Sequence, residues 1–339
     1  MVSISIKIIN KKEIKLKLYD SLSRTMKDFV PDSDNIVRMY VCGPTVYDDP
    51  HFGHARSILS FDSIRRIFLL FGYEVKMVLN YTDVDDKIIN KSNDTGQSVQ
   101  EITSRYIESY GQMLQKLKVM KPTVQPRATE HIKEMLELIK KMEEKGYTYV
   151  ANGSVYFDTS KISWYKDLFK KFSDEEEVLS VDIGEHAEDK RNPNDFVLWK
   201  ARKENEPFWE SPWGPGRPGW HIECSAMSMK YLGEVLTVHG GGQDLKFPHH
   251  QNEIAQTRSV TGKDFARYWL HNGFVTVDGT KMSKSSGNFI TIDSIIDKYS
   301  GNILRFFLLS THYRNPISLS EISLQQAQTS LKRIQMFYS

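Results

Sequence analysis

The sequence predicts an α/β protein whose parallel sheet is split by an α+β insertion. Apolar, strand-forming runs at residues 37–41 and 74–79 flank a helical pattern over residues 55–71. A strand, a helix and a strand within about 45 residues form a βαβ unit, which implies a parallel pair with a right-handed crossover. The same rhythm returns after residue 216, whereas residues 118–215 depart from it.

The composition is that of a soluble globular protein. The 339 residues are 40% hydrophobic and 26% charged, and the formal net charge of +2 neither requires nor excludes a nucleic-acid partner. The length suggests about two domains. No apolar run approaches the roughly 20 residues that cross a bilayer, and the N-terminus lacks the apolar core of a signal peptide. We therefore expect a cytoplasmic protein with no membrane partner.

The elements before the insertion follow from local patterns. Apolar and polar residues alternate over residues 4–8 and 14–18, which predicts a hairpin turning near Asn10 and Lys11. The strand over residues 37–41 comes next, and the helix that follows it ends at Gly72. After the strand over residues 74–79, helical spacing predicts helices over residues 98–120 and 128–145.

The insertion and the second half of the sheet carry their own signals. Asn152-Gly153 between β-rich arms indicates a hairpin, and the acidic run 174–177 is typical of a solvated loop. After the insertion we expect a helix over residues 222–231 and a strand over residues 235–238. Pro248 favours the start of another helix, and a last strand is expected near residues 268–270.

The segment HFGH, from His51 to His54, lies between the first parallel strand and its helix. The amides and the dipole of a helix N-terminus favour a phosphate at this place. Two imidazoles can donate to phosphoryl oxygens, and Gly53 would let a nucleotide approach the backbone. The motif alone is weak, because a polar loop before a helix explains it equally well.

The segment KMSKS, from Lys281 to Ser285, is far more specific. Five fixed residues arise by chance in about one chain in ten thousand of this length. Gly279 and Gly287 flank the segment, which suits a mobile lid. Lys281 and Lys284 can neutralise the charge that builds on a departing pyrophosphate; the alternative is a solvated basic loop.

The segment HGGGQD, residues 239–244, follows a predicted strand. Its glycines, with Gly241 at their centre, permit close backbone approach to a ribose or a base. Asp244 can accept hydrogen bonds from sugar hydroxyls, as acidic residues do in dinucleotide folds. Glycine runs also occur in plain turns, so this segment indicates an ATP site only together with HFGH and KMSKS.

The two cysteines of the chain both lie beside these motifs. Cys42 ends the strand that precedes HFGH, and Cys224 lies in GWHIECSAM. His249 and Glu253 are four residues apart in the helix expected after Pro248, so they share one face. Two thiols, an imidazole and a carboxylate can hold zinc, although a carboxylate is unusual in a structural site. Each cysteine alone is more often a small buried hydrophobe.

Taken together, the motifs resemble those of the class I aminoacyl-tRNA synthetases, specifically the cysteinyl-tRNA synthetase family. The matching segments are MYVCGPTVYDDPHFGHARS, NYTDVDDKI, DKRNPNDFVLWK, GWHIECSAMS, HGGGQDLKFPHHQNEIAQ and GTKMSKSSGN. The resemblance implies a Rossmann-type core that joins L-cysteine to ATP, with Mg²⁺, as cysteinyl-adenylate. It further implies transfer of the cysteinyl group to the terminal adenosine of tRNA(Cys).

The resemblance also implies roles for single residues. It makes four residues the ligands of one zinc ion per chain: Cys42, Cys224, His249 and Glu253. It implies that His51 and His54 stabilise the α-phosphoryl transition state. It also implies that Lys284, with Lys281, holds the triphosphate. It puts Thr82 near the substrate amino group and Trp220 beside the substrate side chain. A zinc ion that binds the substrate thiolate would favour cysteine over serine, because a hydroxyl is harder and far less acidic.

The resemblance divides the chain into four parts. Residues 1–117 and 216–305 are expected to be the two halves of the nucleotide-binding fold, and residues 118–215 the connective insertion. Residues 306–339 would begin a helical stem-contact region. The family continues into an anticodon-binding region, whereas this sequence stops at SLKRIQMFYS, which has helical spacing and no C-cap; we expect a shortened chain.

Three alternatives remain open at this point. The ligase that joins cysteine to glucosaminyl-inositol in mycothiol synthesis has the same catalytic core, and only the acceptor distinguishes it. A small HxGH nucleotidyltransferase is disfavoured by the KMSKS segment and the zinc set. A non-catalytic tRNA-binding paralogue is disfavoured by the intact histidines of HFGH and lysines of KMSKS.

Overall fold

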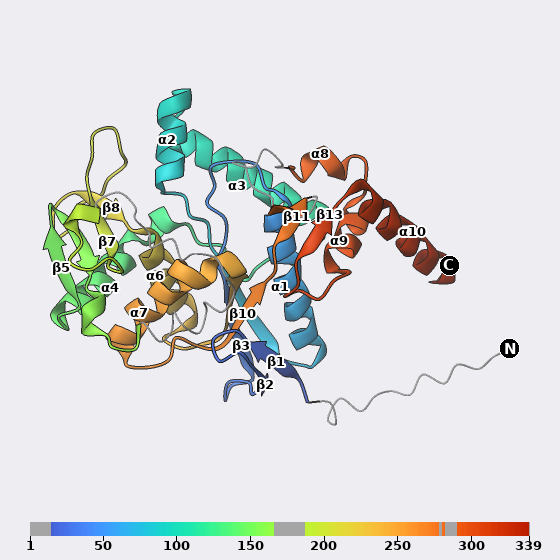
Figure 1. Cartoon of the computed structure of the whole chain (residues 1–339), viewed down its shortest axis with the longest axis horizontal. Helices are drawn as coiled ribbons and strands as arrows, with labels where there is room; N and C mark the ends of the chain where they lie inside the picture. The colour runs from blue at the N-terminus through green and yellow to red at the C-terminus, as the bar shows by residue number, and fades with distance from the viewer. Residues whose placement is uncertain (1–14, 166–186, 278–279, 282–289, 339) are drawn as a thin grey trace.

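The computed structural model describes residues 15–165, 187–277, 280–281 and 290–338 (Figure 1). Its central sheet has the strand order β10-β9-β3-β4, and every neighbouring pair is parallel. The strands are β3 (Ile36–Val41), β4 (Glu74–Leu79), β9 (Leu236–Gly242) and β10 (Ala266–Asn272). The predicted parallel sheet is confirmed, and its two halves come from the two ends of the chain.

Helices cover both faces of this sheet. Helix α1 (Phe52–Leu70) packs on one face, where Met39 and Val41 belong to the same buried cluster as Phe61. Helices α6 (Trp220–Leu232) and α7 (Gln251–Thr261) belong to a second cluster that includes Tyr40. Successive residues of β3 therefore point to opposite faces, as the period of a strand requires.

A separate antiparallel sheet takes three strands from the segment between residues 118 and 215 and a fourth from the residues just after it. Its order is β5-β6-β7-β8, with β5 (Thr148–Ala151), β6 (Ser154–Phe157), β7 (Phe196–Ala201) and β8 (Gly216–Pro218). Asn152 and Gly153 both have positive φ, as the predicted two-residue hairpin needs. The 3₁₀ turn η1 (Ala128–His131) leads into α4 (Ile132–Glu144). In Figure 1 this sheet and α4 lie to one side of the central sheet.

The C-terminal elements lie on the other side of the central sheet in Figure 1. They comprise α8 (Asp293–Ile296), α9 (Gly301–Leu309) and α10 (Glu321–Tyr338). A small sheet joins β12 (Thr280–Lys281), β11 (Val275–Val277) and β13 (Ile317–Leu319) in that order. The division of the chain at residues 117, 215 and 305 remains a prediction.

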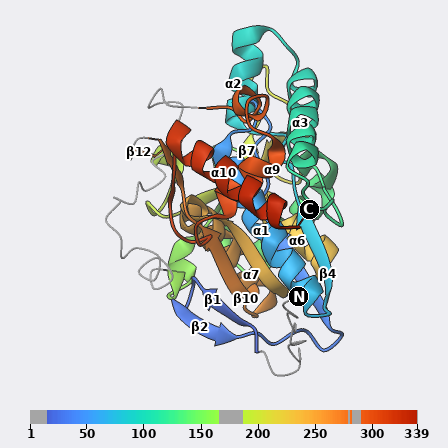
Figure 2. The same cartoon turned by 90° about the vertical axis from the view of Figure 1, so that its right-hand side faces the viewer.

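Three expectations about local structure differ from what is observed. Strand β1 (Lys17–Asp20) pairs with β2 (Thr25–Asp28) in a hairpin that was not expected. The expected arm over residues 4–8 lies outside the described residues. Helix α2 (Asp86–Thr95), which precedes α3 (Val99–Lys116), was not expected at all. Figure 2 shows α2 and α3 at the end of the molecule opposite β1 and β2.

The third difference concerns Pro248. Helix α7 begins only at Gln251, because residues 246–250 form a wider π-type turn, η5 (Lys246–His250), in which Phe247 is extended (φ −136°, ψ 135°). A residue before proline is pushed out of the helical region, and this kinks the chain. None of the helices within the described ranges is long and apolar enough to span a membrane.

Candidate active site and metal centre

A cavity of about 560 Å³ opens at the carboxyl ends of the parallel strands. Val41, Leu79, Gly242 and Asn272, which stand at the ends of the four strands, all line it. Ligands of open α/β sheets bind at this edge because the loops after the strands converge there. The strand order places the first and last parts of the chain around one cavity.

One end of the cavity is formed by the histidines of HFGH. His51 is the N-cap of α1, and its Nδ1 accepts from the backbone N–H groups of Gly53 (3.0 Å) and His54 (3.4 Å). Nδ1 of His54 in turn accepts from the backbone N–H of His51 (3.3 Å). Each neutral imidazole therefore carries its proton on Nε2. The two rings stack with their centroids 3.8 Å apart.

Burial keeps these two imidazoles neutral. It lowers the pKa of His51 to about 4 and holds the pKa of His54 well below its ordinary value, with a further decrease from the neighbouring His51. At neutral pH the pair thus offers two N–H donors rather than two cations. The backbone amides of Gly53 and His54 already donate to His51, so these two amides are not available to a phosphate.

Several glycines of the motifs are needed because neighbouring side chains leave no room for a Cβ, whereas the sequence suggested that they let a ligand approach the backbone. A Cβ on Gly53 would lie 2.8 Å from Cε1 of His51, so this glycine makes room for the capping ring. A Cβ on Gly240 would lie 2.1 Å from the ring of Phe61. Gly241 faces Leu245 and His250 in the same way, whereas Gly242 and Asp244 line the cavity.

The other end of the cavity brings together the four residues expected to hold a metal. The donor atoms of Cys42, Cys224, His249 and Glu253 all lie within 4.8 Å of one another. Cys42 follows β3, Cys224 lies in α6, and Glu253 lies in the first turn of α7. Nε2 of His249 is 2.9 Å from Oε1 of Glu253, so the expected pairing of these two side chains is present despite the late start of α7.

The chemistry of this donor set suits a zinc ion. Two thiols, one imidazole and one carboxylate are the ligand types that zinc takes in fourfold coordination. Burial and the Cys224 thiol hold the pKa of Cys42 well above its ordinary value. Burial also acts to raise the pKa of Cys224, but the hydrogen bond from Cys42 lowers it to about 6. Sγ of Cys42 accordingly donates to Sγ of Cys224 (3.8 Å).

In His249 and Glu253, too, burial opposes the charged form and a neighbouring group favours it. Burial opposes a charge on His249, yet the nearby carboxylate of Glu253 raises its pKa to about 10. Burial likewise opposes a charge on Glu253, but His239 and His249 hold its pKa well below its ordinary value. The protonated His249 therefore supplies the positive charge among these donors, and a metal ion would replace its proton.

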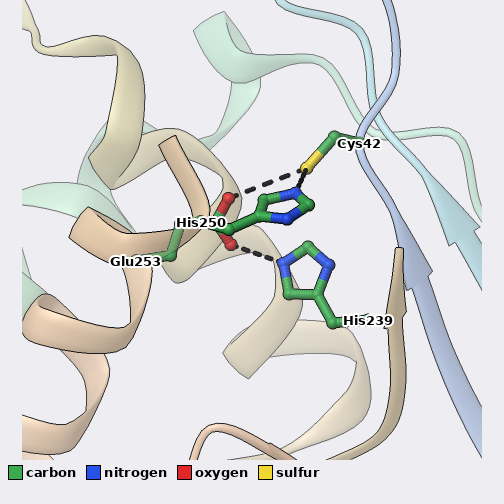
Figure 3. Close-up of side chains that lie close together, drawn as sticks. All are labelled: Cys42, His239, His250 and Glu253. Carbon is green, nitrogen blue, oxygen red and sulfur yellow. Dashed lines mark hydrogen bonds and ion pairs between the residues drawn. The ribbon is translucent and has the colours of Figure 1, made fainter. Parts of the chain in front are cut away.

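A second group of side chains surrounds the same carboxylate (Figure 3). Nε2 of His239 lies 2.5 Å from Oε2 of Glu253, and Nε2 of His250 lies 3.3 Å from Sγ of Cys42. These two histidines form, with Cys42 and Glu253, another set of four donors within 4.8 Å. This set has one thiol where the first has two. The first set is therefore the richer in the sulfur donors that zinc takes, whereas His239 and His250 stand where outer hydrogen bonds orient metal ligands.

The other expected site residues are placed as follows. Trp220 lines the cavity, and its ring centroid lies 4.2 Å from that of His249. Thr82 is 2% exposed and pairs with Thr45, which lines the cavity. Lys281 lies in β12, where only its backbone is described, and Lys284 lies outside the described residues.

Sequence reasoning missed a layer of polar side chains beneath the site. His239, His250, Asn80 and Glu223 are each no more than 1% exposed and contact a site residue. One signal was available: the helix that carries Glu253 reads QNEIAQT, with polar residues at positions that packing should make apolar. Buried polar groups must be hydrogen-bonded, so a polar helix inside a core indicates a site.

Comparisons with known proteins agree with this geometry. The family model described as "tRNA synthetases class I (C) catalytic domain" matches residues 28–329. The chain is 53% identical over 320 residues to a cysteine–tRNA ligase of Geobacter metallireducens, covering 94% of this chain and 65% of that protein. It is 50% identical over 320 residues to a cysteine–tRNA ligase of Clostridioides difficile, covering 94% of this chain and 68% of that protein.

Solved structures show a similar fold at low identity. The methionyl-tRNA synthetase of Mycobacterium tuberculosis, solved with methionyl-adenylate, aligns with a TM-score of 0.68 at 16% identity. That alignment covers 86% of this chain and 67% of the other. The present chain spans about 65% of the length of its Geobacter metallireducens relative.

Proposed function

The chain belongs to the class I (C) tRNA synthetase catalytic-domain family, and from that membership we propose that it acts as a cytoplasmic cysteine–tRNA ligase. It would join L-cysteine to ATP as cysteinyl-adenylate and transfer the cysteinyl group to the terminal adenosine of tRNA(Cys). The names of its relatives, cysteine–tRNA ligases at 50–53% identity, support this substrate.

One observation carries the proposal. Two thiols from distant parts of the chain, Cys42 and Cys224, meet His249 and Glu253 at one end of a cavity whose other end holds two N–H donors. A zinc ion held there would supply a Lewis-acid site that prefers a thiolate to a hydroxyl. Amino-acid choice and phosphate chemistry would then take place in one cavity.

The residues of this chain would divide the work as follows. Trp220, beside His249, would pack against the substrate side chain and exclude water from it. The Nε2–H groups of His51 and His54 would donate to the α-phosphoryl oxygens as negative charge builds on them. Asp244, which lines the cavity, would accept from the ribose hydroxyls, with Gly241 behind it. Thr82 would lie near the amino group of the substrate.

Lys281 and Lys284 would bind the triphosphate of ATP, which enters with Mg²⁺. This assignment rests on the KMSKS motif. The pairing of β12 with β11 supports the assignment, because it brings Lys281 next to Thr276, and Thr276 follows the cavity-lining Val275 in β11. Residues 118–215 would form the connective insertion, and residues 306–339 the beginning of the stem-contact region of a longer tRNA-binding surface.

Amino-acid-dependent exchange of pyrophosphate into ATP tests the proposed activation step without tRNA. We expect exchange with cysteine and a rate with serine that is lower by at least about 10⁴-fold, since the site rewards one polar contact. Charging of a tRNA(Cys) transcript, with glucosaminyl-inositol as the competing acceptor, then tests the transfer step. Exchange that serine supports as well as cysteine does would contradict the proposal.

A further inference from the structure

A chain of hydrogen bonds runs beneath the cavity from Gly43 to Glu223. The backbone N–H of Gly43 donates to Oδ1 of Asn80 (2.9 Å), and Nδ2 of Asn80 donates to the hydroxyl of Thr82 (3.5 Å). That hydroxyl donates to Oε2 of Glu223 (2.7 Å). Asn80, Thr82 and Glu223 are 1%, 2% and 0% exposed, so the chain is closed off from water.

The direction of this chain is fixed at its first link. A backbone N–H can only donate, so Oδ1 of Asn80 accepts and its amide nitrogen is the group that faces Thr82. A hydroxyl has one proton, and Thr82 gives it to Glu223. Thr82 can therefore offer a ligand only a lone pair. At the end of the chain, Oε1 of Glu223 is buried and has no partner among the residues that the structure describes.

The acceptor end of this chain lies beside the place of the substrate. Trp220, Glu223 and Cys224 are spaced i, i+3 and i+4 in α6 and so share one face of the helix. Trp220 and Gly43 line the cavity, and Cys224 belongs to the proposed metal set. The chain of hydrogen bonds thus ends in oxygen atoms that act as acceptors.

We propose that Glu223 is a positioning residue that makes this part of the cavity specific for the α-ammonium group of the amino acid. The inference rests on the proposed function, whose substrate carries a thiol, a carboxylate and an ammonium group. The thiol has the metal set as its partner, and the substrate carboxylate, which can only accept hydrogen bonds, finds no donor in a chain that ends in acceptors. The ammonium group, with three donors and a positive charge, is the one that suits an acceptor-only chain.

The test compares two ligands that differ only in the ammonium group. Cysteine and 3-mercaptopropionate both carry a thiol and a carboxylate, and calorimetry on the zinc-loaded protein gives the Kd of each. Glu223→Gln should raise the Kd of cysteine about 10- to 100-fold, the usual effect of losing a hydrogen bond to a charged group. The Kd of 3-mercaptopropionate and the zinc content should stay unchanged.

Thr82 provides a second, independent pair of variants. Thr82→Val removes the hydroxyl with little change in shape and should reproduce the effect of Glu223→Gln, even if the latter fails to fold. Thr82→Ser keeps the hydroxyl and should restore the Kd of cysteine to within about threefold of the wild-type value. Because the two residues act through one hydrogen bond, the double variant should add little to either single change.

Asp195→Asn is the matched control. Asp195 is 1% exposed and accepts from the hydroxyl of Thr159 (2.7 Å) in the inserted segment. This change should not alter the ratio of the two Kd values. If Glu223→Gln and Thr82→Val weaken both ligands equally, or neither, the inference is overturned while the proposed function stands. If the wild-type protein neither binds cysteine nor catalyses exchange, the proposed function fails, and the inference fails with it.

Discussion

At one end of the cavity four donors, three of them on buried residues, lie within 4.8 Å of one another, whereas at the other end two stacked imidazoles sit at the start of a helix. The first end is crowded with groups that titrate, and their pKa values are displaced in opposite directions: His249 is raised to about 10 and Cys224 lowered to about 6. At the second end burial keeps His51 and His54 neutral.

One fold thus separates two tasks. Two thiols, an imidazole and a carboxylate are donors that a metal cation takes when they lose their protons, so the first end suits a metal that selects the substrate. The two neutral imidazoles keep their N–H groups in place as donors and do not have to gain or lose a proton. The second end therefore suits a phosphate group on which negative charge builds during the reaction. A substitution at one end of the cavity should therefore leave the binding function of the other end intact.

The largest expected effect comes from a ligand of the first end. Cys224→Ser should reduce bound zinc from about one ion per chain to a small fraction, because a thiolate ligand is lost. Cysteine-dependent pyrophosphate exchange should fall by far more than about 100-fold, the upper range for outer-shell changes. Elemental analysis and exchange assays measure the two effects.

Binding of ATP to the same variant is the control, and it should be unchanged within about threefold. Zinc content at the wild-type level in Cys224→Ser would contradict the assignment of the ligands.

The next effect separates two roles of His51. Asn is a good helix N-cap, so His51→Asn can still accept from the backbone N–H of Gly53 but loses the Nε2–H donor. Exchange should slow by about 10²- to 10³-fold, the usual loss for one preorganised donor. Thermal stability and zinc content should remain those of the wild type. His51→Ala loses the cap as well and should lower the free energy of unfolding by about 1 kcal/mol.

If His51→Asn destabilised the protein as much as His51→Ala does, the ring would act in capping through more than its Nδ1. If it left the exchange rate unchanged, the phosphate would have other partners.

A smaller effect is expected one layer behind the metal ligands. Nε2 of His239 holds the second oxygen of Glu253, so His239→Leu should weaken zinc binding about 10- to 100-fold. His239→Gln, whose amide nitrogen can still donate, should lose less. Competition with a zinc chelator measures both affinities. Equal affinities in the wild type and His239→Leu would show that Glu253 needs no such support.

The smallest expected effect is a pH dependence at the second end. The folded-state pKa of His51 is about 4, below its unfolded value of about 6.5. Between these values the unfolded chain binds more protons, so this residue lowers the stability as the pH falls from about 6.5 toward 4 and has no such effect above 6.5. Nitrogen NMR of His51 and His54 should show the Nε2–H tautomer and no titration above about pH 5. Titration of either histidine near pH 6.5 would contradict the lowered pKa values of the folded protein.

Much of the fold was predictable because its elements have strong local signals. Strands β3 and β4 are apolar runs, and α1 repeats apolar residues at helical spacing. Helix α2 was missed because, of its ten residues, only Ile88 and Ile89 are buried, too few to make a period. The pairing of β1 with β2 was not expected, because a strand pattern does not state which neighbour it pairs with.

In the candidate site, too, some residues could be predicted from the sequence and others could not. Cys42 and Cys224 could be singled out because the chain has no other cysteines, and the spacing of His249 and Glu253 put them on one face. The hydrogen-bond chain that ends at Glu223 could not be predicted, because its links join residues up to 141 positions apart. Only the folded arrangement of β4, α6 and the segment after β3 brings them into contact.

We propose that a zinc ion held by Cys42, Cys224, His249 and Glu253 recognises the thiol of the substrate. X-ray absorption at the zinc edge tests it most directly, because it counts sulfur neighbours near 2.3 Å separately from nitrogen and oxygen neighbours near 2.0 Å. We predict two sulfur neighbours in the free protein and three after cysteine is added, with no change on adding serine. A sulfur count that stays the same with cysteine, or a protein that retains no zinc, would contradict the account.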